Sequence, residues 1–149
     1  MDAYLDFLSR KAITDPSTGL TDIPELPVCL FPHQRDIVKW ALRRGPAALF
    51  AGTGLGKSLM ELSWADAIFR DRGGMIILFA PLAVSNQMLR EADKFGIPAR
   101  LVTSQDDCVP GINITNYHKM DHFDLPSFIG IILDESSILK NTDGHYRNK

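Results

Sequence analysis

The sequence predicts an α/β fold built on a mainly parallel β-sheet with helices on both faces. Short apolar runs alternate along the chain with longer segments of helical periodicity, and glycine or proline separates most of them. Strands that alternate with helices connect in parallel, and parallel strands are apolar throughout because helices cover both of their faces. The 149 residues fit one domain of this kind.

Local patterns predict the individual elements. Helices are expected where apolar residues recur at spacings of three and four, and strands where short apolar runs lie between breaking residues. The predicted helices cover residues 2–12, 33–43, 57–71 and 84–95, and the predicted strands cover 47–50, 75–80, 99–103, 112–115 and 128–133. Prolines and glycines predict a loop over 14–28. The chain is therefore divided into an N-terminal helix and loop, 1–28, and the main lobe, 29–149.

Composition argues against several classes of protein. The net charge is −2, so a nucleic-acid module held by overall positive charge is not expected. The two cysteines, Cys29 and Cys108, are too few for a disulfide framework and favour a reducing, cytoplasmic setting. No apolar run is long enough for a membrane span, and the N-terminus lacks the basic cluster of a signal peptide.

The strongest motif is a glycine-rich segment that follows an apolar run and opens a predicted helix. It reads Ala51-Gly52-Thr53-Gly54-Leu55-Gly56-Lys57-Ser58. Glycines let backbone N–H groups surround phosphate oxygens, and the helix N-terminus adds a partial positive charge. Lys57 is expected to reach the β- and γ-phosphates, and Ser58 to offer its hydroxyl to Mg²⁺. The alternative is a glycine-rich turn without a ligand, and Ala51 departs from the usual first glycine of such motifs.

A pair of carboxylates ends the last predicted strand. Asp134 and Glu135 follow the apolar run 128–133 directly. The carboxyl ends of parallel strands form the ligand-binding edge of open α/β sheets. Asp134 is expected to hold Mg²⁺, and Glu135 to orient or deprotonate an attacking water. The alternative is a solvated strand end.

With both motifs placed, the chain resembles the first RecA-like lobe of superfamily 2 helicases and translocases. The likeness is closest to the Swi/Snf-type branch and to DEAD/DEAH-box helicase proteins encoded by phages and prophages. Further segments that carry it are Leu30–Gln34, similar to the Q motif; 79–87, similar to motif Ia; Ile112–Tyr117, similar to motif Ib; and Asp134–Ser137, in the place of motif II.

The resemblance implies ATP and Mg²⁺ as cofactors and assigns roles to residues. Lys57, Asp134 and Glu135 are the implied catalytic residues, and Gln34 is implied to read the adenine edge. The implied nucleotide-binding set is Gln34, Thr53, Gly54, Leu55, Gly56, Lys57 and Ser58, with Ser58 and Asp134 on the metal. Contacts to the backbone of a DNA strand are implied for Pro81, Leu82, Asn86, Thr115 and Asn116. For each of these five, ordinary loop capping is the competing interpretation.

The family's motif III and second RecA-like lobe do not follow motif II in this sequence. The resemblance therefore implies slow or absent hydrolysis, and a second lobe or partner protein that completes the sheet. An alternative is a short phage-derived protein that acts without catalysis by binding a partner, for example as an anti-defence inhibitor. Either setting implies the cytoplasm of a bacterial host or phage-infected cell. A small-molecule kinase is disfavoured by the Q-like and Ib-like segments.

Overall fold

The computed structural model describes residues 3, 5–6, 17–47 and 56–135, and the fold is given for these residues. The α-helices are α2 (Pro32–Arg44), α3 (Lys57–Arg72) and α4 (Leu82–Lys94). The strands are β1 (Met75–Ala80), β2 (Ala99–Leu101), β3 (Gly111–Asn116) and β4 (Gly130–Leu133). Three 3₁₀-helices complete the described part: η1 (Gln105–Asp107), η2 (Tyr117–His122) and η3 (Leu125–Ser127).

The four described strands form one parallel sheet in the order β2-β3-β1-β4. The central strand β1 pairs with β3 from Met75↔Gly111 to Ala80↔Asn116. On its other side β1 pairs with β4, from Ile76↔Gly130 to Phe79↔Leu133. The predicted parallel α/β sheet is confirmed. Among the described strands, β4 has a neighbour on one side only.

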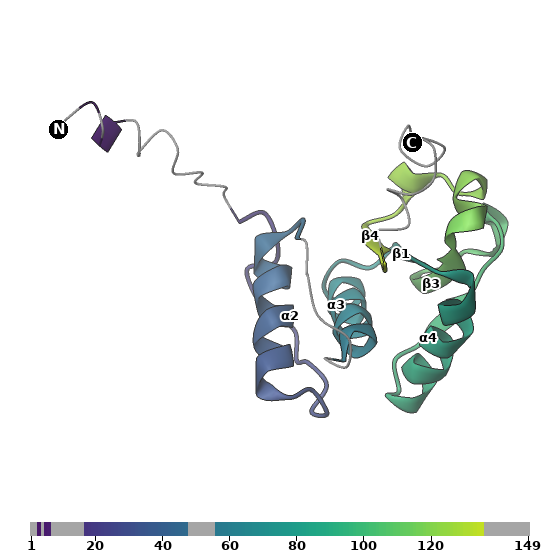
Figure 1. Cartoon of the computed structure of the whole chain (residues 1–149), viewed down its shortest axis with the longest axis horizontal. Helices are drawn as coiled ribbons and strands as arrows, with labels where there is room; N and C mark the ends of the chain where they lie inside the picture. The colour runs from purple at the N-terminus through teal and green to yellow at the C-terminus, as the bar shows by residue number, and fades with distance from the viewer. Residues whose placement is uncertain (1–2, 4, 7–16, 48–55, 136–149) are drawn as a thin grey trace.

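Helical segments cover both faces of the sheet, as the sequence predicts. On one face the three α-helices lie side by side with α3 in the middle (Figure 1). Their apolar side chains join alternate residues of β1 and β3 in the larger core cluster, which includes Ile76, Leu78 and Ile114. On the other face Ile77 and Phe79 pack against η2 and the segments around Phe123 and Phe128. Within the described residues, no helix combines the length and the apolar character that a membrane span requires.

Several element boundaries differ from the predicted ones, among them the strand predicted over 99–103, which ends at Leu101, and two of the differences have clear local reasons. The helix expected to begin at residue 84 begins at Leu82, because Pro81 already has the extended backbone of an N-cap, with ψ 147°, and accepts from the N–H groups of Val84 and Ser85. The strand expected from 128 begins at Gly130, because Phe128 N–H closes the 3₁₀ turn of η3 onto Leu125. The predicted strand 47–50 lies outside the described residues from 48 on, and the predicted helix 2–12 lies almost wholly outside them.

The loop before α2 is attached to that helix by backbone hydrogen bonds. The N–H groups of Thr18, Gly19 and Leu20 donate to the last carbonyls of α2. Gly19 permits this approach, since a Cβ there would lie 1.8 Å from the carbonyl oxygen of Leu42. Leu20 and Leu26 then enter the core. The loop thus packs on the main lobe, and a domain boundary at residue 28 stays a prediction.

Candidate functional site

The structure brings the lysine of the predicted phosphate loop and the two predicted motif II acids together at the carboxyl edge of the sheet. Lys57 is the first residue of α3, and Asp134 directly follows β4. Lys57 Nζ lies 2.9 Å from Asp134 Oδ1 and 3.8 Å from Glu135 Oε1. Asp134 is only 6% exposed. These three residues, predicted as one catalytic group, form one ion-pair cluster.

The backbone of Asp134 is fixed from both sides. Its N–H donates to the carbonyl of Phe79 at 2.8 Å, which continues the pairing of β4 with β1 by one residue. Its carbonyl accepts a hydrogen bond from the hydroxyl of Tyr117 at 2.5 Å. The next residue, Glu135, has φ 55°, in the left-handed region. The strand therefore ends directly before the acid, and Asp134 and Glu135 lie in a turn.

A third carboxylate belongs to this cluster and was missed by sequence reasoning. Glu61 lies on α3, one turn after Lys57, and its Oε2 is buried without a hydrogen-bond partner among the described residues. Burial, and then the negative charge of Asp134, raises the pKa of Glu61 to about 8. The spacing of four from Lys57 was an available signal, because it places both side chains on one face of the helix.

The lysine remains a cation in this setting. Burial lowers the pKa of Lys57, but the hydrogen bond and charge of Asp134, together with the charges of Glu61 and Glu135, outweigh burial and raise it. A lysine held charged at a helix N-terminus is suited to bind phosphate oxygens. Ser58 lies in the same first turn of α3, and its predicted role with Asp134 on a divalent cation stays a prediction.

Gln34 lies against the last glycine of the phosphate loop. Its Oε1 accepts from the N–H of Phe31 at 2.9 Å, closing the first turn of α2. Its Nε2 lies only 2.1 Å from the point where a Cβ on Gly56 would stand, and Gln34 is 4% exposed. The predicted Q-motif glutamine and Gly56 are therefore neighbours. Thr53, Gly54 and Leu55, also predicted to bind nucleotide, lie outside the described residues.

The residues predicted to contact nucleic acid form two groups with different exposure. Pro81 is the N-cap of α4, and the following Leu82 and Asn86 are exposed. Thr115 and Asn116, at the end of β3, are buried. Asn116 Oδ1 accepts from the N–H of His118 and caps η2, the local capping role that was the alternative for this residue. Thr115 Oγ1 is buried with no hydrogen-bond partner among the described residues.

The donors at the carboxyl edge suit Mg²⁺ better than a transition metal. In the described part of the chain, no three His, Cys, Asp or Glu side chains are placed to hold a metal by themselves. Mg²⁺ does not need such a cage, because it is commonly held by one or two carboxylates together with water and substrate phosphates. Asp134 and the Ser58 hydroxyl supply oxygen donors of this type.

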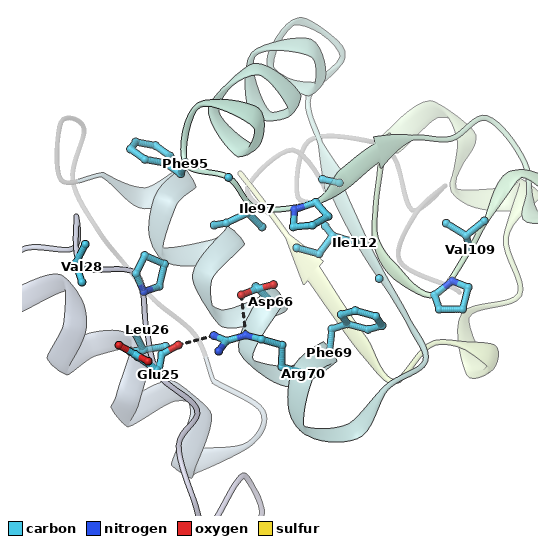
Figure 2. Close-up of a pocket in the computed structure, with 16 residues that line it drawn as sticks. Glu25, Leu26, Val28, Asp66, Phe69, Arg70, Phe95, Ile97, Val109 and Ile112 are labelled. Carbon is cyan, nitrogen blue, oxygen red and sulfur yellow. Dashed lines mark hydrogen bonds and ion pairs between the residues drawn. The ribbon is translucent and has the colours of Figure 1, made fainter.

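A separate cavity of about 750 Å³ lies at the opposite edge of the sheet (Figure 2). It opens beside the beginnings of β2 and β3, and none of the predicted site residues lines it. Its walls are mainly apolar, and its polar groups are largely paired. Arg70 Nε binds Asp66 Oδ2 at 2.9 Å, and Arg70 Nη2 donates to the carbonyl of Glu25 at 2.5 Å. The cavity therefore lies apart from the predicted site residues.

Comparison with solved structures places the fold among helicases. The chain is similar to the crystal structure of the UvsW helicase from bacteriophage T4, with a TM-score of 0.64 and 18% sequence identity. The match covers 91% of this chain and 51% of the UvsW chain, so the chain spans about half of that helicase. No protein-family model matches the sequence, and no curated protein matches it. The described fold is thus an α/β lobe of the RecA-like helicase type.

Proposed function

We propose that this chain is the ATP-binding first lobe of a superfamily 2 DNA helicase or translocase of the Swi/Snf-like, phage type. The observation that supports it best is the 2.9 Å contact between Lys57 and Asp134 at the carboxyl edge of a helicase-type sheet. A lysine at the start of a helix and an acid at the end of a strand are the two charged parts that a phosphate-loop ATPase needs. The neighbouring Gln34 and Gly56 place the Q-like segment at the same edge.

The proposed roles follow from the chemistry of each group. Lys57 binds the β- and γ-phosphates, which requires it to exchange at least part of its contact with Asp134. Asp134 and Ser58 hold Mg²⁺, which neutralises charge on the phosphates. Glu135, whose side chain is the more exposed of the two acids, orients the attacking water. Mg²⁺ bound there would also offset the repulsion between the Asp134 and Glu135 carboxylates.

Hydrolysis by this lobe alone is proposed to be slow. The transition state of phosphoryl transfer gains several orders of magnitude in rate from an arginine supplied across the nucleotide. The proposed source is a second RecA-like lobe or a partner protein. The whole activity then belongs to the assembled site.

DNA is the proposed polymer partner, bound weakly and through its backbone. Support comes from the N-terminus of α4, which has no side-chain cap and lies at the carboxyl edge of the sheet. Uncapped N–H groups at a helix start bind phosphate without reading sequence. The buried, unpartnered hydroxyl of Thr115 is on the neighbouring strand, and Ser85 in the first turn of α4 donates to the Thr115 carbonyl at 3.5 Å.

Calorimetric titration with Mg·ATPγS tests the nucleotide site. The parent chain is expected to bind, Lys57→Ala to lose binding, and Asp134→Ala to lose the dependence on Mg²⁺. Lys94→Ala, which removes an exposed lysine at the end of α4, is the matched control and should bind like the parent. Circular dichroism on each variant shows that the fold persists. Equal binding by Lys57→Ala and the parent would refute the proposal.

A second candidate is a binding protein that keeps the lobe without its chemistry. The observation that favours it is that β4 has a neighbour on one side only among the described strands, while Ile131 and Leu133 in β4 and Ile129 just before it are each about two-fifths exposed. An unpaired strand edge with apolar side chains is a template for pairing with another chain. This candidate predicts that Lys57→Ala still binds the partner and that Ile131→Lys does not. The first candidate predicts instead that Lys57→Ala removes the binding of nucleotide.

A further inference from the structure

Tyr117 makes an unusual contact with the proposed metal site. It is the residue directly after β3, and its side chain is 1% exposed. Its hydroxyl donates a 2.5 Å hydrogen bond to the backbone carbonyl of Asp134. Its ring stacks on Phe79, with 6.1 Å between ring centroids and 25° between planes. A buried aromatic ring therefore reaches from one strand to the turn that carries the acid.

We propose that Tyr117 is a positioning residue for the Asp134 carboxylate, acting through the Asp134 carbonyl and without touching nucleotide. This inference rests on the proposed function, in which Asp134 holds Mg²⁺. The contact that matters is at the peptide bond between Asp134 and Glu135. The Tyr117 hydroxyl fixes the direction of its carbonyl, and the next residue, Glu135, has a left-handed φ of 55°.

The direction of that carbonyl matters because β4 is short and lies at an edge of the described sheet. Only four residues of β4 precede the acid, and β1 is their one described neighbour. The N–H of Asp134 is anchored on Phe79, so rotation about the Asp134 backbone is limited at one end. The Tyr117 hydroxyl limits it at the other end. A carboxylate on a backbone held at both ends keeps one orientation toward Lys57.

Packing alone does not account for a tyrosine at this position. A phenylalanine would fill the same space against Phe79 and would bury no polar group. A buried hydroxyl is retained at low cost only if it has a partner, and this one uses the carbonyl of the acid itself. Groups that orient a metal ligand commonly change metal affinity by 10–100-fold when they are removed.

The test uses the full chain and separates metal from nucleotide. Binding of ATPγS is measured with excess Mg²⁺ and with EDTA, and the Mg²⁺ concentration that gives half of the metal-dependent gain is determined. Tyr117→Phe is expected to raise that concentration by about 10-fold and to leave binding in EDTA unchanged. Phe123→Leu is the matched control, because Phe123 packs on Phe79 in the same cluster and its side chain carries no polar group that could hydrogen-bond Asp134.

Each outcome decides a different statement. A raised Mg²⁺ requirement in Tyr117→Phe but not in Phe123→Leu supports the inference. A normal Mg²⁺ requirement, or an equal loss of ATPγS binding with and without Mg²⁺, overturns the inference while the proposed function stands on the binding of the parent chain. Absence of nucleotide binding in the parent overturns the proposed function and the inference with it. If Tyr117→Phe does not fold, Phe79→Leu serves in its place, because it loosens the packing of the Tyr117 ring and keeps the hydroxyl. The Mg²⁺ requirement is then expected to rise as well, but by less.

Discussion

Gly56→Ala should destabilise the chain through two separate effects at the edge of the phosphate loop. Gly56 has φ 69° and ψ 36°, in the left-handed region, where a side chain costs about 1–2 kcal/mol. Its position also admits no side chain, because a Cβ would lie 2.1 Å from Gln34 Nε2. Gln34 is held by the N–H of Phe31, so its amide moves aside only by losing that hydrogen bond.

The two effects can be estimated and separated. Forced overpacking costs about 1–3 kcal/mol, so the total loss is about 2–5 kcal/mol. Gly96→Ala is the control for conformation alone: Gly96 has φ 69°, and nothing lies within 4 Å of its Cβ position. It should lose only about 1–2 kcal/mol. Adding Gln34→Ala to Gly56→Ala should recover the difference, apart from the cost of Gln34→Ala itself.

Urea unfolding of the three variants and the double variant measures these values as a double-mutant cycle. A coupling energy of about 1–3 kcal/mol between positions 34 and 56 is expected, of the sign that relieves the clash. Two results together would refute the placement of Gln34 against the loop. Gly56→Ala would lose no more stability than Gly96→Ala, and Gly56→Ala would show no coupling to Gln34→Ala. These results would also remove the structural support for a Q-like role of Gln34.

Three further predictions concern buried polar groups. Glu61 has a pKa raised to about 8, so the folded chain holds a proton that the unfolded chain releases near pH 4.5. The free energy of unfolding should therefore fall as pH rises between these values. Urea midpoints in metal-free buffer should show this slope in the parent and not in Glu61→Gln. Asn113→Ala should lose about 2–4 kcal/mol, because this fully buried amide binds the carbonyls of Ile76 and Val109 and the N–H of Val109; a loss below 1 kcal/mol in urea unfolding would contradict that account. Thr115→Val removes an unpartnered hydroxyl, so thermal unfolding should show equal or higher stability by up to about 1 kcal/mol, and a clear loss would mean that the hydroxyl has a partner.

The parallel sheet was predictable because its strands carry an unambiguous pattern. The run at 75–80 is apolar at every position, and the structure uses both faces of that strand in its two core clusters. The ends of elements were less predictable because neighbouring backbone decides them. Pro81 as an N-cap lengthens α4 at its start, and the η3 turn shortens the last strand. Neither effect is visible in hydrophobic periodicity.

The pairing of Lys57 with Asp134 was predictable because both residues mark the carboxyl edge of one sheet. The contributions of Glu61 and Tyr117 were not predicted, since they depend on which side chains face the acid in three dimensions. The burial of Thr115 and Asn116 was also missed. Every residue of β3 is buried, because both faces of this strand are covered. Polar residues near its end are therefore buried whichever face their side chains occupy. A motif-based assignment supplies the type of residue and leaves its exposure open.

The exposure of β4 bears on how well the acid is supported. On the α3 side, β4 packs against the ring of Trp64. A Cβ placed on Gly130 would lie 3.3 Å from atoms of that ring. On the other side, Ile131 and Leu133 are about 40% exposed, although their register partners Ile77 and Phe79 in β1 are fully buried. The cluster around Tyr117 and Phe123 therefore covers β1 and stops short of β4. A strand or partner added along β4 would cover these side chains in part and stiffen the strand that ends in Asp134, so such an addition should strengthen the proposed Mg²⁺ binding as well as stability.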